Sequence, residues 1–378
     1  MIKIFHIISS LDQGGAESAL TRLVTGTPDS IKHIVISMKD RGVFGDYLID
    51  NGVQVYELKM IGFFGFISGL FRLITLIKKE SPDIIQTWMY HADLIGGIIG
   101  KFFLRPQVVW GIRNSMQSAH HVKFRTRVIL KMCAFLSGVI PKKIVANSNT
   151  AFKNHVNFGY KESLMEVIVN GVDPDVFCSS IVEREKVRGS LKISSNIFLI
   201  GMVARWDPQK DHKNLLKAIS YLKSKYENFE VILVGKGLDS GNKSLINLIR
   251  YYQLEDKINL LGKRGDIPSI LNALDIHVLS SASESFPNVL VEAMSCGVPC
   301  ISTNVGDSSD IVGDCGWIVD SESPEELSKA IIEAISESKH ADLWDERKVL
   351  CQKRVVGNYS MESFIDSFCS LWTSLCKT

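Results

Sequence analysis

The feature that most constrains the fold is a repeated alternation of short apolar segments with helical patterns along the whole chain. The apolar segments are rich in Val and Ile, and they are near-continuous rather than alternating with polar residues. The expected strands are residues 2–9, 33–38, 53–58, 83–88, 108–112, 143–148, 165–170, 197–204, 229–235, 257–262, 275–280, 298–303 and 316–320. Such strands, separated by helices, indicate parallel sheets that are covered on both faces. The pattern predicts an α/β protein with two doubly wound domains.

The length of 378 residues suits two domains better than one core. We expect a first Rossmann-like domain over residues 1–175 and a second over residues 176–358, because a turn-rich link at residues 170–180 follows the last strand of the first half. Residues 360–376 have a helical apolar period. We therefore expect a C-terminal helix, within residues 359–378, that packs back on the first domain.

Composition places the chain among globular proteins, with 46% hydrophobic and 22% charged residues. Its eight cysteines include no CxxC pair and no zinc-like spacing with histidine, which favours a reduced, cytoplasmic setting.

The longest apolar run, residues 60–71, is shorter than the about 20 residues that a membrane-spanning helix needs. We expect a partly buried helix there in preference to one that touches a membrane.

Positive charge is concentrated in the first half of the chain. Residues 1–180 carry 20 Lys and Arg against 14 Asp and Glu, and residues 94–161 carry 11 basic residues and no acidic one. An unopposed basic surface attracts anionic partners, so we expect anionic lipid headgroups or a phosphorylated acceptor at this stretch, with a merely solvated face as the alternative. Nucleic acid is not expected, because interleaved aromatic residues and a known binding module are missing.

The stretch SASESFPNVLVEAMSCGVPC, residues 281–300, predicts a short helix directly after a strand. Pro287 suits the first helical turn and Gly297 the helix end, so we expect the helix over about residues 287–296. It would begin at the carboxyl edge of a parallel sheet, where ligands of such sheets bind. Its free N–H groups and the positive end of its dipole would form an anion site.

Glu284 and Glu292 place one carboxylate on each side of this predicted anion site. Carboxylates repel phosphate but accept hydrogen bonds from hydroxyl groups. The arrangement suits a ligand whose phosphates are flanked by sugars, as in a nucleotide sugar. A capping role for Glu284 and a solvated helix position for Glu292 are the alternatives.

Two cations, Arg205 and Lys210, lie five residues apart in the loop that follows the strand at residues 197–204. An arginine fork and a lysine point charge are natural partners for a pyrophosphate. The turn VGKGLDSG, residues 234–241, is a second glycine-rich link between a strand and a helix. Its glycines are one residue out of register with the dinucleotide fingerprint, so it predicts a close backbone approach and no hydride-transfer cofactor.

Together these motifs resemble glycosyltransferase family 4, whose members are retaining enzymes with the two-domain GT-B fold. The segment from Glu284 to Glu292 is similar to the E-x7-E motif of that family, and the resemblance covers nearly the whole chain. The other similar stretches are GGAE (14–17), VANS (145–148), NGVD (170–173), ARWDPQKD (204–211), VGKG (234–237), LLGKRGDI (260–267) and VPCISTNVG (298–306). The resemblance implies two Rossmann-like domains that face each other across a cleft.

The resemblance also implies that the second domain binds a nucleotide-sugar donor. Glu284 would hold the hydroxyl groups of the donor sugar, and Glu292 those of the ribose. Arg205 and Lys210 would hold the pyrophosphate. The other implied donor-binding residues are Asn288 and Val289 through main-chain N–H groups at the pyrophosphate, Arg264 through its main chain at the base, and Gly235 in its glycine-rich turn.

In the first domain, the resemblance implies that Gly14 and Gly15 approach the donor phosphates and sugar, where any side chain would obstruct. His91 would lie beside the reacting sugar, with a purely structural role as the alternative. Arg113 and Asn114 would line the acceptor side.

The predicted activity is retaining transfer of a sugar from a nucleotide diphosphate sugar, most commonly a UDP-sugar in this family. Its acceptor would be a saccharide or lipid-linked saccharide in surface polysaccharide or glycolipid biosynthesis. The residues expected to be catalytic are Glu284, His91, Arg205 and Lys210. Because the cations and the helix start would stabilise the leaving diphosphate, no metal and no cofactor is expected.

Three questions stay open at this level. Ser285 stands where the family usually has a glycine after the first glutamate, which would leave less room for the donor. Asp307 stands at the usual second glycine of the downstream turn, which leaves open which sugar hydroxyl groups contact that part of the site. The alternative activities are a nucleotide-sugar epimerase or hydrolase of the same fold, and a non-catalytic nucleotide-sugar-binding subunit. We expect a cytoplasmic protein, either free or peripheral on the inner face of the cytoplasmic membrane.

Overall fold

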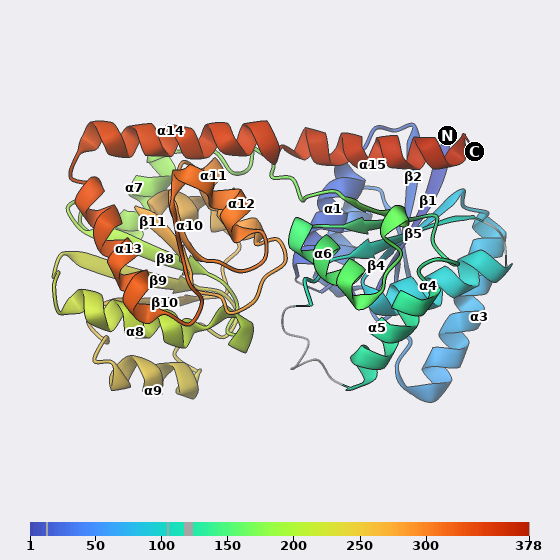
Figure 1. Cartoon of the computed structure of the whole chain (residues 1–378), viewed down its shortest axis with the longest axis horizontal. Helices are drawn as coiled ribbons and strands as arrows, with labels where there is room; N and C mark the ends of the chain where they lie inside the picture. Colours follow the sequence, from blue (N-terminus) through green and yellow to red (C-terminus); the bar gives the residue numbers. More distant parts are fainter. Residues whose placement is uncertain (13, 104–105, 117–123, 378) are drawn as a thin grey trace. The chain divides into compact units, whose positions relative to one another are not determined.

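The computed structural model describes residues 1–12, 14–103, 106–116 and 124–377, which form two compact units (Figure 1). Unit 1 comprises Met1–Gly171 and Glu362–Thr378, and unit 2 comprises Val172–Met361. Two of the basic residues counted above, Arg105 and Lys123, lie outside the described residues. Each unit has its own parallel sheet, so the two-sheet α/β architecture predicted from the strand pattern is confirmed.

Unit 1 is built on a seven-stranded parallel sheet with the order β3-β2-β1-β4-β5-β6-β7. The strands are β1 (Ile2–Ile8), β2 (Ile31–Ser37), β3 (Gln54–Glu57), β4 (Ile84–Trp88), β5 (Gln107–Ile112), β6 (Lys143–Ala146) and β7 (Met165–Val167). β1 pairs with β2 on one side and with β4 on the other. The chain runs outward from β1 in one direction and from β4 in the other, so the topological switch point lies between these two strands.

The helices of unit 1 cover both faces of this sheet. They are α1 (Gly15–Gly26), α2 (Gly42–Asp50), α3 (Gly62–Glu80), α4 (Tyr90–Phe103), α5 (Phe124–Leu136), α6 (Asn149–Phe158) and the C-terminal α15 (Met361–Cys376). α3 and α4 bury Leu73 and Ile99 in one core cluster with β1, and α4 and α5 bury Leu94 and Leu130 in a second. On α15, Trp372 is fully buried, and its indole Nε1 donates a hydrogen bond to Gln86 of β4 at 3.3 Å.

The apolar run at residues 60–71 forms the first half of α3, but its phenylalanines are exposed. At about 1.5 Å per residue, the 19 residues of α3 span about 28 Å, whereas the five residues of β4 span about 17 Å at about 3.3 Å each. The helix is therefore longer than the sheet that it covers. Its buried residues, Gly69, Leu73 and Ile77, all belong to the middle and the end of the helix. The expected burial is thus limited to that part, and the first turns of α3 remain uncovered.

Unit 2 is built on a six-stranded parallel sheet with the order β10-β9-β8-β11-β12-β13. The strands are β8 (Phe198–Val203), β9 (Phe229–Val234), β10 (Ile258–Gly262), β11 (Ile276–Leu279), β12 (Cys300–Thr303) and β13 (Trp317–Val319). β8 and β11 are paired neighbours from which the chain runs outward in opposite directions. The switch point of this sheet therefore lies between β8 and β11.

The helices of unit 2 are α7 (Ile181–Ser190), α8 (His212–Lys223), α9 (Lys243–Tyr251), α10 (Ile267–Ala273), α11 (Asn288–Ser295), α12 (Ser308–Val312), α13 (Pro324–Glu337) and α14 (Ala341–Asn358). α11 is the helix predicted after the strand at residues 275–280, shorter by one residue at each end. Pro287 keeps an extended backbone and caps α11, so it precedes the first turn in which we expected it. Gly297 follows the helix with φ of 76°, a left-handed conformation that glycine adopts without strain.

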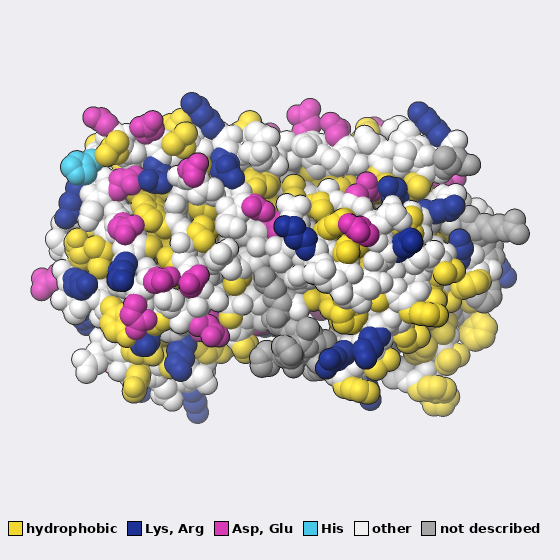
Figure 2. All heavy atoms as spheres, in the orientation of Figure 1, with side chains coloured by type: hydrophobic (Ala, Val, Ile, Leu, Met, Phe, Trp, Pro, Cys, Tyr) yellow, Lys and Arg dark blue, Asp and Glu magenta, His cyan; other side chains and the backbone are white. Residues whose placement is uncertain are grey.

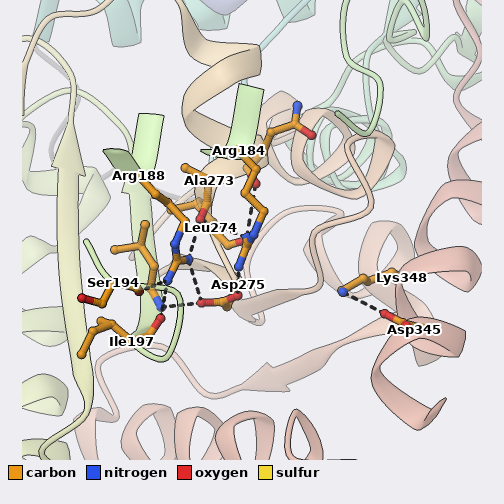
Figure 3. A network of polar contacts seen from close by, with 11 residues as sticks. Arg184, Arg188, Ser194, Ile197, Ala273, Leu274, Asp275, Asp345 and Lys348 are labelled. Atoms are coloured by element: carbon orange, nitrogen blue, oxygen red, sulfur yellow. Dashed lines mark hydrogen bonds and ion pairs between the residues drawn. The ribbon is translucent and has the colours of Figure 1, made fainter. Parts of the chain in front are cut away.

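A dense polar network ties α7 to the amino edge of the unit 2 sheet (Figure 3). Asp275, immediately before β11, accepts hydrogen bonds from Arg184 at 2.6 Å, from Arg188 at 3.2 Å and from the backbone N–H of Leu199 at 2.6 Å. Arg188, only 5% exposed, also donates to the carbonyl groups of Ala273, Ser194 and Ile197. These contacts connect the starts of β8 and β11 to α7, at the edge opposite to the predicted ligand site.

Among the described residues, no helix is both long enough and apolar enough to cross a membrane.

Candidate functional site

Lys210 and Glu284 meet at the switch point of the unit 2 sheet. Lys210 lies in the loop that leaves β8 and Glu284 in the loop that leaves β11, so adjacent parallel strands bring together residues 74 positions apart. The ammonium Nζ of Lys210 donates to Oε1 of Glu284 at 2.5 Å, and the two side chains are 18% and 11% exposed. Sequence motifs predict both residues for the site, but no local pattern indicates that they pair with each other.

Several polar contacts hold these two loops in position. Ser281 donates its hydroxyl to Oε1 of Glu284 at 2.6 Å, and Ser280 donates to the carbonyl oxygen of Lys210 at 3.1 Å. The carbonyl oxygen of Gln209 accepts the N–H of Ala282 at 2.8 Å. None of these four residues was predicted for the site. The sequence indicates Ser280 and Ser281 only through their place, as small polar residues at the end of the strand that precedes Glu284.

Two buried histidines, His212 and His277, lie close enough to Lys210 for its positive charge to lower their pKa values. Burial, and then the positive charge of Lys210, lower the pKa of His277 to about 3 and that of His212 to about 4. His277 lies on β11 and accepts the backbone N–H of Val203 through Nε2 at 3.3 Å. Both imidazoles are therefore neutral at neutral pH, and Lys210 is the cation at the centre of this site.

Arg205 lies nearer to solvent than Lys210. Its Nε donates to Asp207 at 3.0 Å, and its side chain is 53% exposed. Because an exposed ion pair is weakly held, the guanidinium can exchange Asp207 for an anionic ligand at small energetic cost.

The glycine-rich turn after β9 packs against the loop that carries Arg205. Gly235 has φ of 148°, and a Cβ atom there would lie 2.0 Å from the carbonyl oxygen of Ala204. Gly237, with φ of 78°, lies beside the side chain of Trp206. The backbone N–H of Trp206 donates to the carbonyl oxygen of Lys236 at 2.8 Å. The close backbone approach predicted for this turn is therefore present, and its observed partner is the neighbouring loop.

The start of α11 follows Glu284 directly and is covered by the loop after β12. Asn288 and Val289 form the first turn of α11, and Glu292 lies one turn further; all three are partly buried. A Cβ atom at Gly306 would lie 2.6 Å from the carbonyl oxygen of Ser285, and Asp307 donates its N–H to that same oxygen at 3.0 Å. The two departures from the family pattern, Ser285 and Asp307, are thus in contact through their backbones.

Arg264, predicted beside the base, lies in the loop after β10. Its guanidinium makes two hydrogen bonds to Asp266, at 2.8 and 2.6 Å. The residues of unit 2 that were predicted for the donor therefore follow four strands, β8, β9, β10 and β11, and all lie at the carboxyl edge of one sheet.

In unit 1, the predicted residues also lie at the carboxyl ends of strands. Gly14 caps α1 after β1, and Gly15 is the first residue of that helix. The backbone of Gly14 is extended, with φ of −163°, so any residue could adopt it. A Cβ atom at Gly14 would lie 2.3 Å from the carboxylate of Glu17, and a small movement of that flexible side chain would make room for it.

His91 lies in the first turn of α4, directly after β4, and is exposed. Partial burial and the positive charge of Lys39 lower its pKa, so the imidazole is neutral at neutral pH. Met89, at the turn before the helix, has φ of 72°. A non-glycine residue in this region stores strain, which is often found at functional sites.

Arg113 and Asn114 follow β5, but their surroundings differ. The guanidinium of Arg113 stacks on Trp88 at 4.3 Å and donates to Asn170 at 2.8 Å, and burial lowers its pKa to about 9. Its Nε and Nη2 atoms are buried and have no hydrogen-bond partner among the described residues. Asn114 is exposed, and its side-chain oxygen accepts the N–H of Met116 at 2.8 Å.

Asp93 is buried behind Arg113. It accepts hydrogen bonds from Thr87 at 2.6 Å and from the N–H of Gly111 at 3.3 Å. Burial raises its pKa to about 7, against these hydrogen bonds and the charge of Arg113. Asp93 was not predicted for the site. In the sequence it is distinguished only as the last acidic residue before the basic residues 94–161.

Across the described ranges, no group of three His, Cys, Asp or Glu side chains could hold a metal ion. A surface pocket of about 480 Å³ lies between β3 and α3, lined by residues that include Tyr56, Phe71 and Arg72. None of its lining residues was predicted for the site.

Two protein families match the two halves of the chain. The family described as Glycosyltransferase Family 4 matches residues 13–176, and the family described as Glycosyl transferases group 1 matches residues 183–348. The second match contains Arg205, Lys210 and Glu284.

Similar proteins cover nearly the whole chain. A UDP-Gal:alpha-D-GlcNAc-diphosphoundecaprenol alpha-1,3-galactosyltransferase of Escherichia coli is 24% identical over 99% of this chain and 97% of its own. The capsular polysaccharide biosynthesis glycosyltransferase CapH of Staphylococcus aureus is 24% identical over 82% of this chain and 84% of its own. The crystal structure of Anabaena Alr3699/HepE in complex with UDP has a TM-score of 0.87, with 23% identity over 99% of this chain and 100% of that one. The last similarity establishes the shared fold.

Proposed function

Because the chain belongs to glycosyltransferase family 4 and has the GT-B fold, we propose that it transfers a sugar with retention of anomeric configuration from a UDP-sugar to a lipid-linked saccharide. The single observation that carries this proposal is the Lys210–Glu284 pair at the switch point of the unit 2 sheet. It joins a cation for phosphate to an acceptor for sugar hydroxyl groups at the sheet edge where ligands bind.

Lys210 and Arg205 supply the positive charge for the diphosphate. Glu284 neutralises Lys210 in the structure, so neither of these two largely buried charges is left unpaired. A bound phosphate would attract the ammonium group, while the carboxylate would accept hydrogen bonds from the sugar. The first turn of α11 adds the N–H groups of Asn288 and Val289 at the positive end of the helix dipole. Glu292 would accept from the ribose, and the Arg264 loop and Gly235 would border the nucleoside.

Cleavage of the bond between the anomeric carbon and the diphosphate oxygen moves an electron pair to the leaving group. Positive charge then develops on the sugar and negative charge on the diphosphate. Arg205, Lys210 and the start of α11 stabilise that negative charge, in a position fixed before the reaction begins. The acceptor hydroxyl attacks from the same face of the sugar, and the departing phosphate receives its proton, so the new bond keeps the original configuration.

Unit 1 would supply the acceptor side. His91, neutral and exposed at the start of α4, can hydrogen bond to the reacting sugar. The buried, incompletely paired guanidinium of Arg113 and the exposed Asn114 lie at the end of the next strand. Gly14 and Gly15 would leave space for the donor.

The names of similar proteins support the choice of substrates. The Escherichia coli protein is named for a UDP-galactose donor and a diphosphoundecaprenol-linked acceptor, and CapH for capsular polysaccharide biosynthesis. These names motivate a UDP-sugar, a lipid-linked saccharide and a peripheral location at the membrane that carries it. A nucleotide-sugar epimerase or hydrolase of the same fold is the second candidate, and product analysis with donor alone separates the two.

Glu284→Gln tests the proposed role of the site. The substitution keeps the size of the side chain but removes the charge that pairs with Lys210, and we expect transfer to fall about 100-fold or more. Glu325→Gln, at an exposed pair with Lys217, is the matched control and should leave transfer unchanged. Nuclear magnetic resonance of the product's anomeric centre tests retention. Unchanged transfer by Glu284→Gln would overturn the site, and an inverted product the mechanism.

A further inference from the structure

Two helices of unit 1, α3 and α5, carry aromatic side chains that are exposed among the described residues of that unit. On α3, Phe63, Phe64 and Phe71 are 74%, 86% and 67% exposed. On α5, Phe124 and Phe135 are 81% and 85% exposed. We call these residues the phenylalanine surface. Such a concentration of large apolar side chains is uncommon on a monomer and marks an interaction surface.

The exposed apolar residues of α5 lie along one face of the helix. Phe124, Val128, Met132 and Phe135 follow each other at intervals of four, four and three residues, and all four are exposed. The buried residues of the same helix, Leu130 and Cys133, lie on another face. α5 is therefore apolar both toward the core and toward solvent, and core packing explains only one of these faces.

The charge around the phenylalanine surface has one sign. On α5, Arg125, Arg127 and Lys131 are exposed among the apolar residues, and α3 carries Arg72, Lys78 and Lys79. Residues 58–79 and 94–161 contain no Asp or Glu. Figure 2 shows hydrophobic side chains gathered with Lys and Arg over the part of unit 1 that α3 and α5 occupy in Figure 1. An apolar surface within unopposed positive charge matches an anionic lipid bilayer.

The position of this surface within unit 1 fits the same partner. α3 and α5 follow β3 and β5, so each helix begins at the carboxyl edge of the sheet. Phe63, Phe64 and Phe124 lie at these helix starts, at the sheet edge that also carries Arg113 and Asn114. The pocket lined by Phe71 and Arg72 adjoins α3.

We infer that the phenylalanine surface docks unit 1 onto an anionic membrane, with Phe63, Phe64, Phe124 and Phe135 inserted among the lipids and the surrounding cations at the headgroups. This inference rests on the proposed function, because a lipid-linked acceptor would be presented in that membrane. Insertion removes the aromatic rings from water, and each cation near an anionic surface strengthens binding. The docked sheet edge then holds Arg113 and Asn114 near the headgroup layer.

Vesicle binding by the full chain tests the inference. The probes are vesicles of phosphatidylcholine alone and of phosphatidylcholine with phosphatidylglycerol, and flotation measures the bound fraction. We expect binding to the anionic vesicles, about 10-fold weaker binding to the neutral ones, and weakening by salt. Phe63→Ala/Phe64→Ala and Arg125→Gln/Arg127→Gln/Lys131→Gln should each weaken binding to anionic vesicles about 10-fold or more.

A matched control lies on α9 of unit 2, which also combines exposed cations with an exposed aromatic residue. Lys243→Gln/Arg250→Gln/Tyr251→Ala changes the same kinds of side chain and should leave vesicle binding within about twofold of the parent, because these residues lie outside the phenylalanine surface. Near-ultraviolet circular dichroism and a thermal shift with UDP verify that each variant is folded.

Three outcomes would overturn the inference. One is equal binding of parent and phenylalanine variants to anionic vesicles, and another is no binding by the parent. The third is a dimer that the phenylalanine variants convert to a monomer without vesicle binding, which would assign the surface to a second copy of the chain. Failure of the proposed function is distinct, since vesicle binding without sugar transfer refutes only the activity. Transfer to a detergent-dispersed acceptor without vesicle binding refutes only the docking.

Discussion

The two edges of the unit 2 sheet hold ion pairs of different kinds. At the amino edge, Arg188 and Asp275 belong to a network in which the arginine donates to three carbonyl groups and the aspartate also accepts a backbone N–H. At the carboxyl edge, Lys210 has one carboxylate partner, Glu284. The first network joins α7 to two strands, whereas the second joins two loops. Burial and charge alone would mark both as functional, and only the connectivity distinguishes them.

The difference shows how one sheet separates stability from ligand binding. At the amino edge, groups of the fold already occupy most of the hydrogen-bonding positions of Arg188 and Asp275. A ligand would therefore find few donors or acceptors there to bind. The carboxyl-edge pair leaves two further ammonium donors of Lys210 and the second oxygen of Glu284 for other contacts. Substitutions at the two edges, and at residues close to the carboxyl-edge pair, test this division.

Arg188→Met should lower the free energy of unfolding by about 3–5 kcal/mol, because it leaves Asp275 and three carbonyl groups short of a buried partner. Urea denaturation monitored by circular dichroism measures the loss. Lys348→Met, at the exposed pair with Asp345 (Figure 3), is the control and should change stability by about 0.5 kcal/mol or less. UDP affinity of folded Arg188→Met should stay near that of the parent. A large loss of affinity without a loss of stability would contradict the division between the edges.

Lys210→Gln should lower the rate of sugar transfer about 10²–10³-fold, as expected when a donor to a developing negative charge is removed. Steady-state kinetics at saturating donor measures the effect. The free energy of unfolding should fall by less than in Arg188→Met, because Glu284 keeps the hydroxyl of Ser281 as a hydrogen-bond donor. Lys217→Gln, on the exposed side of α8, is the matched lysine control and should keep the parental rate. A collapse of stability in Lys210→Gln would place the pair with the structural network of the other edge.

Gly235→Ala should destabilise the protein by about 1–3 kcal/mol and weaken UDP binding at the same time. Its φ of 148° is strained for alanine, and the new Cβ would displace Ala204, next to Arg205. Gly357→Ala, on α14, is the control, since a Cβ atom there would meet no other atom within 4 Å and the residue lies outside the predicted donor site. Isothermal titration and urea denaturation of both variants test the link. Lost stability with unchanged UDP affinity would show that the turn supports only the fold.

His277→Gln should flatten the dependence of stability on pH. In the folded protein the pKa of His277 is lowered to about 3, so the stability that it contributes is complete above pH 6.5 and is lost as the pH falls toward 3. Between pH 7 and pH 5.5, this titration should lower the free energy of unfolding of the parent by about 1 kcal/mol. Urea denaturation at the two pH values should show a loss that is smaller by this amount in the variant. An unchanged pH dependence would mean that His277 is not a neutral neighbour of Lys210.

Much of this arrangement could be predicted from the sequence because it depends on local patterns. Apolar, β-branched segments between helical patterns identified every strand that the described residues form, and Gly297 marked the end of α11. The residues predicted to bind the donor, from Arg205 to Glu292, do follow strands of one sheet. The role of each residue was supplied by the resemblance to a family.

The contacts across the sheet could not be predicted, because they join residues far apart in the chain. Arg188 and Asp275 are separated by 87 positions, and nothing in either local sequence indicates that they meet. The same limit applied to α3, where an apolar run predicted a partly buried helix but not which of its residues would be covered. Only the length of the helix relative to its sheet left Phe63 and Phe64 exposed.

Local sequence patterns specify the order of strands and helices, the two-sheet class and the loops that carry polar residues, because backbone preference and hydrophobic period act over a few residues. The tertiary structure alone decided that Lys210 is paired with Glu284, that Arg188 is structural and that the first turns of α3 face solvent. Each of these depends on which strands are neighbours and how far a helix extends beyond them, and such distances arise only when the sheet is assembled.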